Sequence, residues 1–358
     1  MSIEKKPFGQ LPTGEQVTCY TMTNGRGESV SLLNLGANIA ALKVRGENGT
    51  MADVVTGFDT LEGYLKPHGC MGDTIGRYGN RIARGEFTLE GVAYHLARNN
   101  GENHLHGGPT GFATRLWDAA VQPGDGLDRV IFHRVSPDGE EGYPGTLDVT
   151  VTYTWDDAGC LAIRYQAATD RTTHCNLTNH AYFNLAGHDG GTVADHWVKI
   201  CADVTTRVDE GLIPTGDYCP VAGTPMALEG NAPLGDLDQR SAGNQQMQFG
   251  HGGFDHNYVL RKGSAMGLAA EVRHPGTGRC MRVLTDQPGV QFYTANTTNI
   301  PGGKGGAVYG RHSSFCLETQ HFPDTPNQPG FPSTILRPGE TYDTTTIYQF
   351  LLLRELEG

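Results

Sequence analysis

The sequence predicts an all-β fold, and three observations lead to that prediction. Short runs of β-branched and aromatic residues alternate with polar residues, and turns rich in glycine and proline separate them. No stretch shows the i, i+3, i+4, i+7 spacing of an amphipathic helix over three turns. The 358 residues contain no Ser/Pro-rich linker, block of like charges or repeat of fixed period. We therefore expect residues 1–358 to form one antiparallel β-sandwich domain.

The strand-like segments follow one another closely along the chain. Residues 30–37 read as a strand that ends in a turn, and residues 48–49, Asn-Gly, are a favoured hairpin turn. Residues 53–58 repeat the strand pattern. Alternation is clearest at 147–155, and the segment 344–350 is also strand-like.

Composition and charge restrict the class of protein. The net charge of −12 argues against a nucleic-acid partner, because phosphate binding requires a basic face. No segment approaches the ~18 apolar residues of a membrane span, and residues 1–7 do not resemble a signal peptide. The eight cysteines are scattered without a C-x-x-C pair, which favours reduced thiols. We expect a cytoplasmic protein that binds a small polar molecule.

The segment 178–185, Thr-Asn-His-Ala-Tyr-Phe-Asn-Leu, combines strand-forming and chemically active residues. If it is a strand, His180, Tyr182 and Asn184 share one face. A histidine held by a phenol and an amide can exchange protons near neutral pH, because its unperturbed pKa is about 6.5. A core histidine satisfied by its neighbours is the alternative.

Two further segments carry polar clusters. In residues 76–85, Arg81 beside Asn80 can hold vicinal hydroxyls with its fork of donors, or can tie down a loop carbonyl instead. In residues 99–108, His104 and His106 share a strand face, as two metal ligands might. No third ligand follows at a recognisable spacing, so we expect no metal, and the glycines after His106 favour it as a binding residue.

The C-terminal third supplies the carboxylates. Asp255 follows a flexible turn, where it can bind sugar hydroxyls or cap the turn, and Gln291 shares a strand face with Tyr293. Glu318 lies within an apolar strand, where a carboxylate is costly unless it is paired or functional. The glycines around Lys304 do not form a phosphate loop, and no dinucleotide fingerprint occurs. The sequence therefore predicts no cofactor.

Taken in order, these segments resemble the aldose 1-epimerase (galactose mutarotase) family. The strings that match are GRYGNRI at 76–82, NHLHGG at 103–108, TNHAYFNL at 178–185, IPTG at 213–216, FDHNYVL at 254–260, QPGVQFYT at 287–294 and CLETQ at 316–320. Each string is short, but the ordered set covers nearly the whole chain. The segment 111–117 departs from the family, with Ala and Thr in place of the frequent Asp-Lys.

The resemblance implies the large antiparallel β-sandwich of the galactose mutarotase type and interconversion of the α and β anomers of free aldohexoses such as galactose and glucose. It places the catalytic acid on His180 and the catalytic base on Glu318. It places substrate binding on the residues Asn80, Arg81, His106, Asp255 and Gln291. Ring opening and re-closure need one base and one acid, without a metal or a nucleotide.

Two alternatives from other classes remain at this point. A glycoside hydrolase would pair Asp255 with Glu318 across a glycosidic bond. A non-catalytic carbohydrate-binding domain would keep a polar cleft without accelerating anomer exchange. The preferred aldose is not predicted, and a monomer and a homodimer are both compatible with the sequence.

Overall fold

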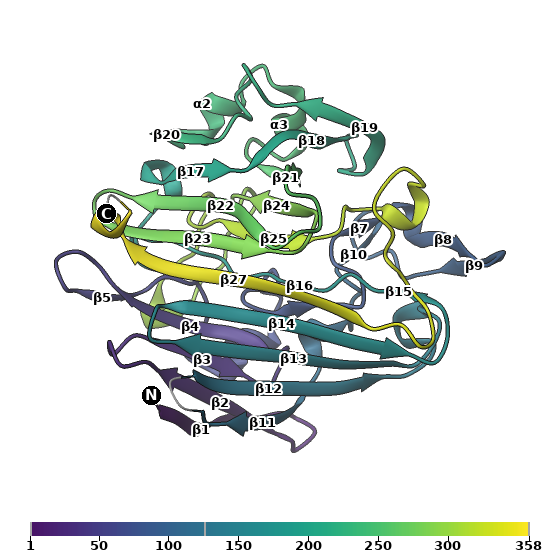
Figure 1. The fold of residues 1–358 in the computed structure, drawn as a ribbon, viewed down its shortest axis with the longest axis horizontal. Coiled ribbons are helices and arrows are strands. Elements are labelled where there is room, and N and C mark those ends of the chain that lie inside the picture. The colour runs from purple at the N-terminus through teal and green to yellow at the C-terminus, as the bar shows by residue number, and fades with distance from the viewer. Residues whose placement is uncertain (1, 125–126, 357–358) are drawn as a thin grey trace.

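The computed structural model describes residues 2–124 and 127–356, and strands dominate it (Figure 1). An N-terminal sheet has the order β1-β2-β3-β4-β5, with strands Ser2–Gln10, Gln16–Thr23, Ser29–Leu33, Asn38–Arg45 and Met51–Asp53. A second five-stranded sheet has the order β19-β18-β21-β24-β25, with strands Pro214–Pro220, Ala202–Val208, Asp255–Leu260, Gly289–Tyr293 and Cys316–Gln320. The all-β prediction is confirmed.

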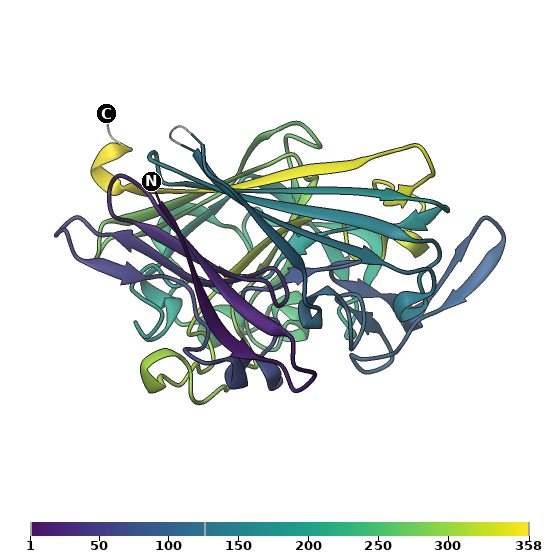
Figure 2. The ribbon, with the colours of Figure 1, turned by 90° about the horizontal axis from the view of Figure 1, so that it is seen from below.

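The largest sheet has nine strands in the order β11-β12-β13-β14-β27-β23-β22-β17-β20. Their bounds are Asp118–Gln122, Leu127–Ser136, Leu147–Asp156, Cys160–Thr169, Tyr342–Leu352, Arg279–Thr285, Gly267–His274, Trp197–Ile200 and Glu229–Pro233. The predicted strands at 147–155 and 344–350 are β13 and part of β27. Figure 2 shows β12, β13, β14 and β27 in one layer, with the N-terminal strands crossing beneath it.

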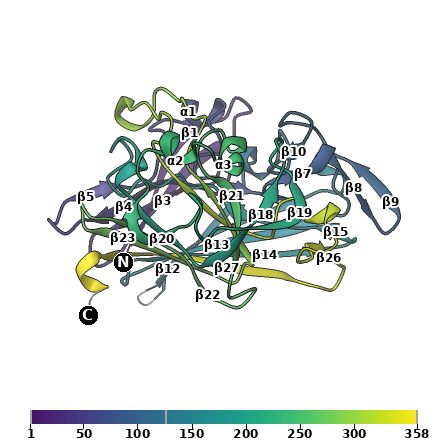
Figure 3. The same ribbon diagram turned by 90° about the horizontal axis from the view of Figure 1, so that it is seen from above.

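Short elements connect these layers. Four small antiparallel pairs are β10 with β7, β15 with β26, β16 with β6 and β8 with β9, with bounds His104–Leu105, Arg81–Ile82, Thr173–His174, Ile335–Leu336, Thr178–Asn179, Thr74–Ile75, Glu86–Leu89 and Val92–His95. The α-helices α1, α2 and α3 have five residues each, at Leu61–Leu65, Leu237–Ser241 and Gln245–Phe249. In Figure 3 the three helices, β7 and β10 lie on the side of the molecule away from β27. Within the described residues, no helix has the length and apolarity to span a membrane.

One apolar core joins the three large sheets. Leu32 of β3, Val151 of β13 and Phe292 of β24 belong to the same cluster of fully buried side chains. Alternation explains this cluster, because every second residue of a strand points to the same face. β13 has that pattern over its whole length, with buried residues at every second position. We propose that residues 1–358 fold as a single domain around this shared core.

The segment 178–185 is not the continuous strand that alternation predicts. Only Thr178–Asn179 pairs regularly, as β16. Beyond it the backbone bonds go to separate partners: the carbonyl of His180 accepts from Gly72, and Phe183 exchanges bonds with Phe315. The Asn179 side chain accepts from the Ala181 amide, a local turn that competes with a strand ladder. After Asn179 the segment therefore runs as irregular backbone between the sheets.

The predicted strand at 53–58 is also wrong, because β5 ends at Asp53.

The buried side chain of Arg77 links the loop that precedes β7 to the loop that follows β12 through hydrogen bonds. Its side chain is 2% exposed and donates to Ser136 Oγ (2.9 Å) and to the carbonyls of Ser136 (3.0 Å), Pro137 (2.8 Å) and Pro144 (3.0 Å). We expect Arg77→Ala to lower the free energy of unfolding by roughly 3 kcal/mol, because it leaves buried acceptors unpaired.

Chemical denaturation monitored by fluorescence measures this change. Arg164→Ala is the matched control, because Arg164 is half-exposed and its ion pair with Asp343 lies at the surface. Its loss should cost less than about 1 kcal/mol. Equal losses in the two variants would contradict the structural role of Arg77.

Candidate active site

A cleft of about 260 Å³ is lined by residues of strands and of the loops beside them. Its wall contains six of the seven residues predicted as site residues: Asn80, Arg81, His106, His180, Asp255 and Glu318. They come from strands and loops that are far apart in sequence. The structure therefore brings the dispersed polar residues of the sequence into one cavity.

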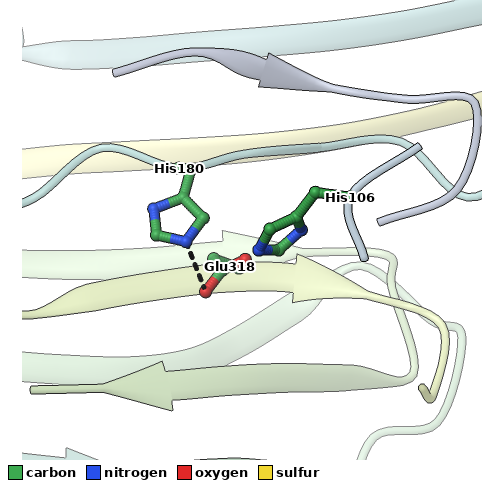
Figure 4. A group of neighbouring side chains, drawn as sticks. All are labelled: His106, His180 and Glu318. Carbon is green, nitrogen blue, oxygen red and sulfur yellow. Dashed lines mark ion pairs between the residues drawn. The ribbon is translucent and has the colours of Figure 1, made fainter. Parts of the chain in front are cut away.

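Glu318 forms the buried end of this cleft. It lies at the centre of β25, a strand that is buried at all five positions, and its side chain is 2% exposed. Its Oε1 is 3.5 Å from Nε2 of His180 (Figure 4). Its Oε2 has no hydrogen-bond partner among the residues that the structure describes. Burial, and then the charge of Asp255, raise the pKa of Glu318 well above its ordinary value, while Arg81 opposes this rise. The raised pKa makes the ionised carboxylate of Glu318 a stronger base than an exposed carboxylate.

His180 faces Glu318 from the irregular segment after β16. It is 5% exposed, and its ring lies 4.9 Å from the ring of Tyr182 and 5.1 Å from that of His106. Burial lowers the pKa of His180 to about 4. The imidazole is therefore neutral at pH 7 and becomes a strong acid whenever it is protonated.

His106 is held as a fixed hydrogen-bond donor. The amide of Asn80 donates to its Nδ1 (3.1 Å), and its own amide donates back to the carbonyl of Asn80 (3.1 Å). Because an amide N–H can only donate, the neutral ring of His106 carries its proton on Nε2. A Cβ atom at Gly107 would lie 1.9 Å from the carbonyl oxygen of Gly76. The close approach of the backbone at Gly76, and not a ligand, therefore requires a glycine at this position.

Arg81 and Asp255 form the opposite wall. Arg81 Nε donates to Asn100 Oδ1 (3.0 Å), and its Nη2 lies 3.5 Å from Asp255 Oδ2. Gln291 is 3% exposed and donates to Asp255 Oδ1 (2.6 Å) from behind. A guanidinium and a carboxylate side by side offer donors and acceptors to neighbouring hydroxyls, as sugar recognition requires.

Nitrogen and oxygen atoms of His106, His180 and Glu318 all lie within 4.8 Å of one another, which raises the question of a metal. An imidazole must present a lone pair to an ion. At His106 the nitrogen facing the cleft carries the proton, and moving that proton to Nδ1 would oppose it to the Asn80 amide. This arrangement disfavours the cluster as a metal site.

The predicted histidine pair at 104 and 106 does not share a face. His104 is fully buried and contacts the carbonyl of Ala97 (2.7 Å) and the hydroxyl of Tyr143 (2.8 Å). The strand β10 ends at Leu105, and His106 adopts a positive φ of 54°, which turns its side chain into the cleft. The prediction of a shared face is wrong because alternation ends with the strand.

Gln291, the seventh predicted site residue, does not line the cleft and contacts Asp255 from behind the wall. Sequence reasoning assigned no substrate contact to several other residues of the wall. Cys70, Asn100, Tyr182 and Tyr293 also line the cleft. Asn100 lies in the segment 99–108, where the sequence analysis considered only the histidines. Its contact with Arg81 is long-range, so the sequence of the segment does not reveal it. Cys70 lies in a loop with a positive φ of 60°, and no local pattern distinguishes it from the other cysteines.

Comparison with known proteins agrees with this geometry. Residues 18–349 match the model of the family described as aldose 1-epimerase. The chain belongs to the aldose 1-epimerase family. The resemblance seen in the sequence is thereby confirmed, together with its all-β fold.

Relatives match over nearly the whole chain. Galactose mutarotases from Sus scrofa and Homo sapiens are each 46% identical to it, with alignments that cover 98% of this chain and 99% and 98% of theirs. An aldose 1-epimerase from Escherichia coli is 35% identical over 95% of this chain and 97% of its own. A solved aldose epimerase homologue from C. elegans superposes with a TM-score of 0.84 at 30% identity, covering 93% of this chain and 98% of that structure.

The paired contacts of Arg81 predict how a substitution acts. Arg81→Lys keeps the charge but cannot reach Asn100 and Asp255 with one planar group. We expect KM for the sugar to rise by about tenfold, the size of one or two lost polar contacts, with a smaller effect on kcat.

Steady-state kinetics of anomer exchange measures both constants. The control is Arg207→Lys, a substitution at an exposed position of β18, which should leave both constants unchanged. Unaltered KM in Arg81→Lys would contradict a binding role for the guanidinium.

Proposed function

We propose that the chain is an aldose 1-epimerase that interconverts the α and β anomers of free aldohexoses, with galactose and glucose as its expected substrates. The observation that supports this most directly is the separation of 3.5 Å between Glu318 Oε1 and His180 Nε2. The C1 hydroxyl oxygen and the ring oxygen of a pyranose are bonded to the same carbon. One carboxylate and one imidazole at this separation can therefore contact both oxygens at once.

Glu318 and His180 share a single proton, and the reaction uses the form of the pair in which that proton lies on His180 and Glu318 is ionised. Glu318 removes the proton of the C1 hydroxyl while His180 gives a proton to the ring oxygen, and the bond between C1 and the ring oxygen breaks. The aldehyde then rotates about its C1–C2 bond. Re-closure on the other face returns the proton from Glu318 to the C1 oxygen and from the ring hydroxyl to His180, so the pair ends as it began.

The remaining residues hold the sugar. In this proposal Arg81, His106 and Asp255 contact its hydroxyls, and the fixed Nε2–H of His106 acts as a donor. Asn80 orients His106 through its amide, and Gln291 orients Asp255 from behind. Alignment of both proton transfers is the benefit of this rigid wall.

We further propose a cytoplasmic protein with a monosaccharide as its partner, either a monomer or a homodimer. The support is chemical. All eight cysteines are free thiols, as expected in a reducing compartment. The net charge of −12 disfavours nucleic acid as a partner.

Two substitutions test the acid–base pair. Glu318→Gln keeps the shape but loses the base, and His180→Asn cannot deliver a proton, so each should lower kcat by roughly 10²–10⁴-fold. The double variant should lose less than the product of the single losses, because both groups act in one event.

Polarimetry of freshly dissolved α-D-galactose and α-D-glucose, with and without the purified protein, measures these rates. Rates near the wild type in either single variant would refute this mechanism. Lack of acceleration by the wild-type protein would favour a carbohydrate-binding domain, and hydrolysis of aryl glycosides would favour a glycoside hydrolase.

The pH dependence of kcat/KM should be bell-shaped. The pair holds one proton between the pKa of His180, about 4, and the raised pKa of Glu318, so activity should fall on both sides of this range. Asp255 raises the pKa of both groups. Asp255→Asn should therefore move both limbs to lower pH, as rates measured from pH 3 to 10 would reveal. A shift to higher pH would contradict this electrostatic assignment.

A further inference from the structure

His106 and His180, which face each other in the cleft, differ in the group that contacts Nδ1. Nδ1 of His106 contacts the backbone amide of Asn80, which can only donate. Nδ1 of His180 contacts the thiol of Cys316, whose Sγ lies 3.5 Å away. Cys316 is fully buried, and a cysteine can donate through S–H or accept at sulfur. The contact between Cys316 and His180 is therefore compatible with two tautomers of the catalytic ring.

The transfer of protons by His180 requires one of these two tautomers. His180 gives its proton from Nε2, the nitrogen that faces Glu318 and the cleft. After that transfer the neutral ring keeps its other proton on Nδ1, and the same form takes a proton back at Nε2. A ring protonated on Nε2 alone has no lone pair there to accept one. The working histidine therefore needs a hydrogen-bond acceptor at Nδ1.

We propose that the sulfur of Cys316 accepts the Nδ1–H of His180 and so keeps Nε2 as the atom that exchanges protons with the ring oxygen of the sugar. Cys316 is then a positioning residue that acts through His180. This inference rests on the proposed epimerase function, which makes His180 the acid.

The register of β25 brings the two contacts together. Cys316 and Glu318 are two residues apart in this strand, so their side chains point to the same face. Sγ of Cys316 lies 3.5 Å from Nδ1, and Oε1 of Glu318 lies 3.5 Å from Nε2. The imidazole thus spans the space between two side chains of one strand. A single strand sets both the distance to the base and the tautomer of the acid.

A sulfur suits this position because it is an uncharged acceptor. Burial, and then the charge of Glu318, raise the pKa of the Cys316 thiol well above its ordinary value, so the thiol stays neutral. A carboxylate at Nδ1 would stabilise the imidazolium and raise the pKa of His180. Next to a neutral sulfur, that pKa stays low, and a protonated His180 readily gives up its proton.

Nitrogen NMR of protein labelled with ¹⁵N-histidine tests the tautomer without an activity assay. At pH 7, where both rings are neutral, we expect the proton of His180 on Nδ1 and that of His106 on Nε2. Spectra of His180→Asn and His106→Asn assign the two signals. A proton on Nε2 of His180 in the wild-type protein would overturn the proposal, because the thiol would then be the donor.

The kinetic constants of two Cys316 variants provide a second test of the proposal. Cys316→Ala should lower kcat by roughly five- to tenfold, the effect of one weak hydrogen bond, and leave KM within about twofold. Cys316→Ser keeps an acceptor and should recover most of that loss. Cys280→Ala, which removes a fully buried thiol from β23, is the control for packing and should keep wild-type kcat.

The outcomes separate this inference from the proposed function. Wild-type kcat and an unchanged tautomer in Cys316→Ala would overturn the role of Cys316. Equal losses in the Ala and Ser variants would overturn it too, because packing alone would explain them. If the wild-type protein failed to accelerate anomer exchange, the proposed function would fall, and the NMR spectra would still decide which atom donates.

Discussion

The structure depends on the burial of one carboxylic acid. Glu318 is 2% exposed in the middle of a strand, and transfer of an ionised carboxylate into such a place costs several kcal/mol. The charge of Asp255 adds to this cost, the charge of Arg81 opposes it, and the pKa of Glu318 rises as a result. Strand pairing fixes the position of Asp255 relative to Glu318. β24 lies beside β25 and brings Gln291 opposite Glu318, and β21 lies beside β24 and begins with Asp255. The energetic cost of burial raises the pKa of Glu318 and so strengthens its ionised carboxylate as a base.

The two histidines show how the backbone assigns chemical roles. Both rings lie in one cleft, 5.1 Å apart, and burial lowers the pKa of both. Their difference comes from Nδ1, which faces an amide at His106 and a thiol at His180. Asn80 and His106 reach this arrangement through positive φ angles of 68° and 54°. Two residues of the same type thus act as a fixed donor and as a proton carrier.

Local pattern predicted the parts of the fold that local forces determine. Alternation identified β13 and part of β27. It failed at 178–185, because beyond Asn179 that segment takes its hydrogen bonds from several distant loop segments. It also failed at His106, since a left-handed residue cannot be read from side-chain periodicity. The position of Gln291 behind Asp255 depends on the pairing of two strands, which one strand's sequence does not contain.

The place of β27 in the large sheet bears on how the chain folds. This strand, the last in the described part of the chain, lies at the interior of the sheet, between β14 and β23. Until it is synthesised, both neighbours present open edges, which are prone to pair with other chains. Its partners are more than a hundred and about sixty residues earlier in the sequence, so folding has to wait for contacts of long range. The ribosome must therefore release the chain as far as Leu352 before the sheet can close, and a nascent chain stalled before β27 would be a substrate for chaperones.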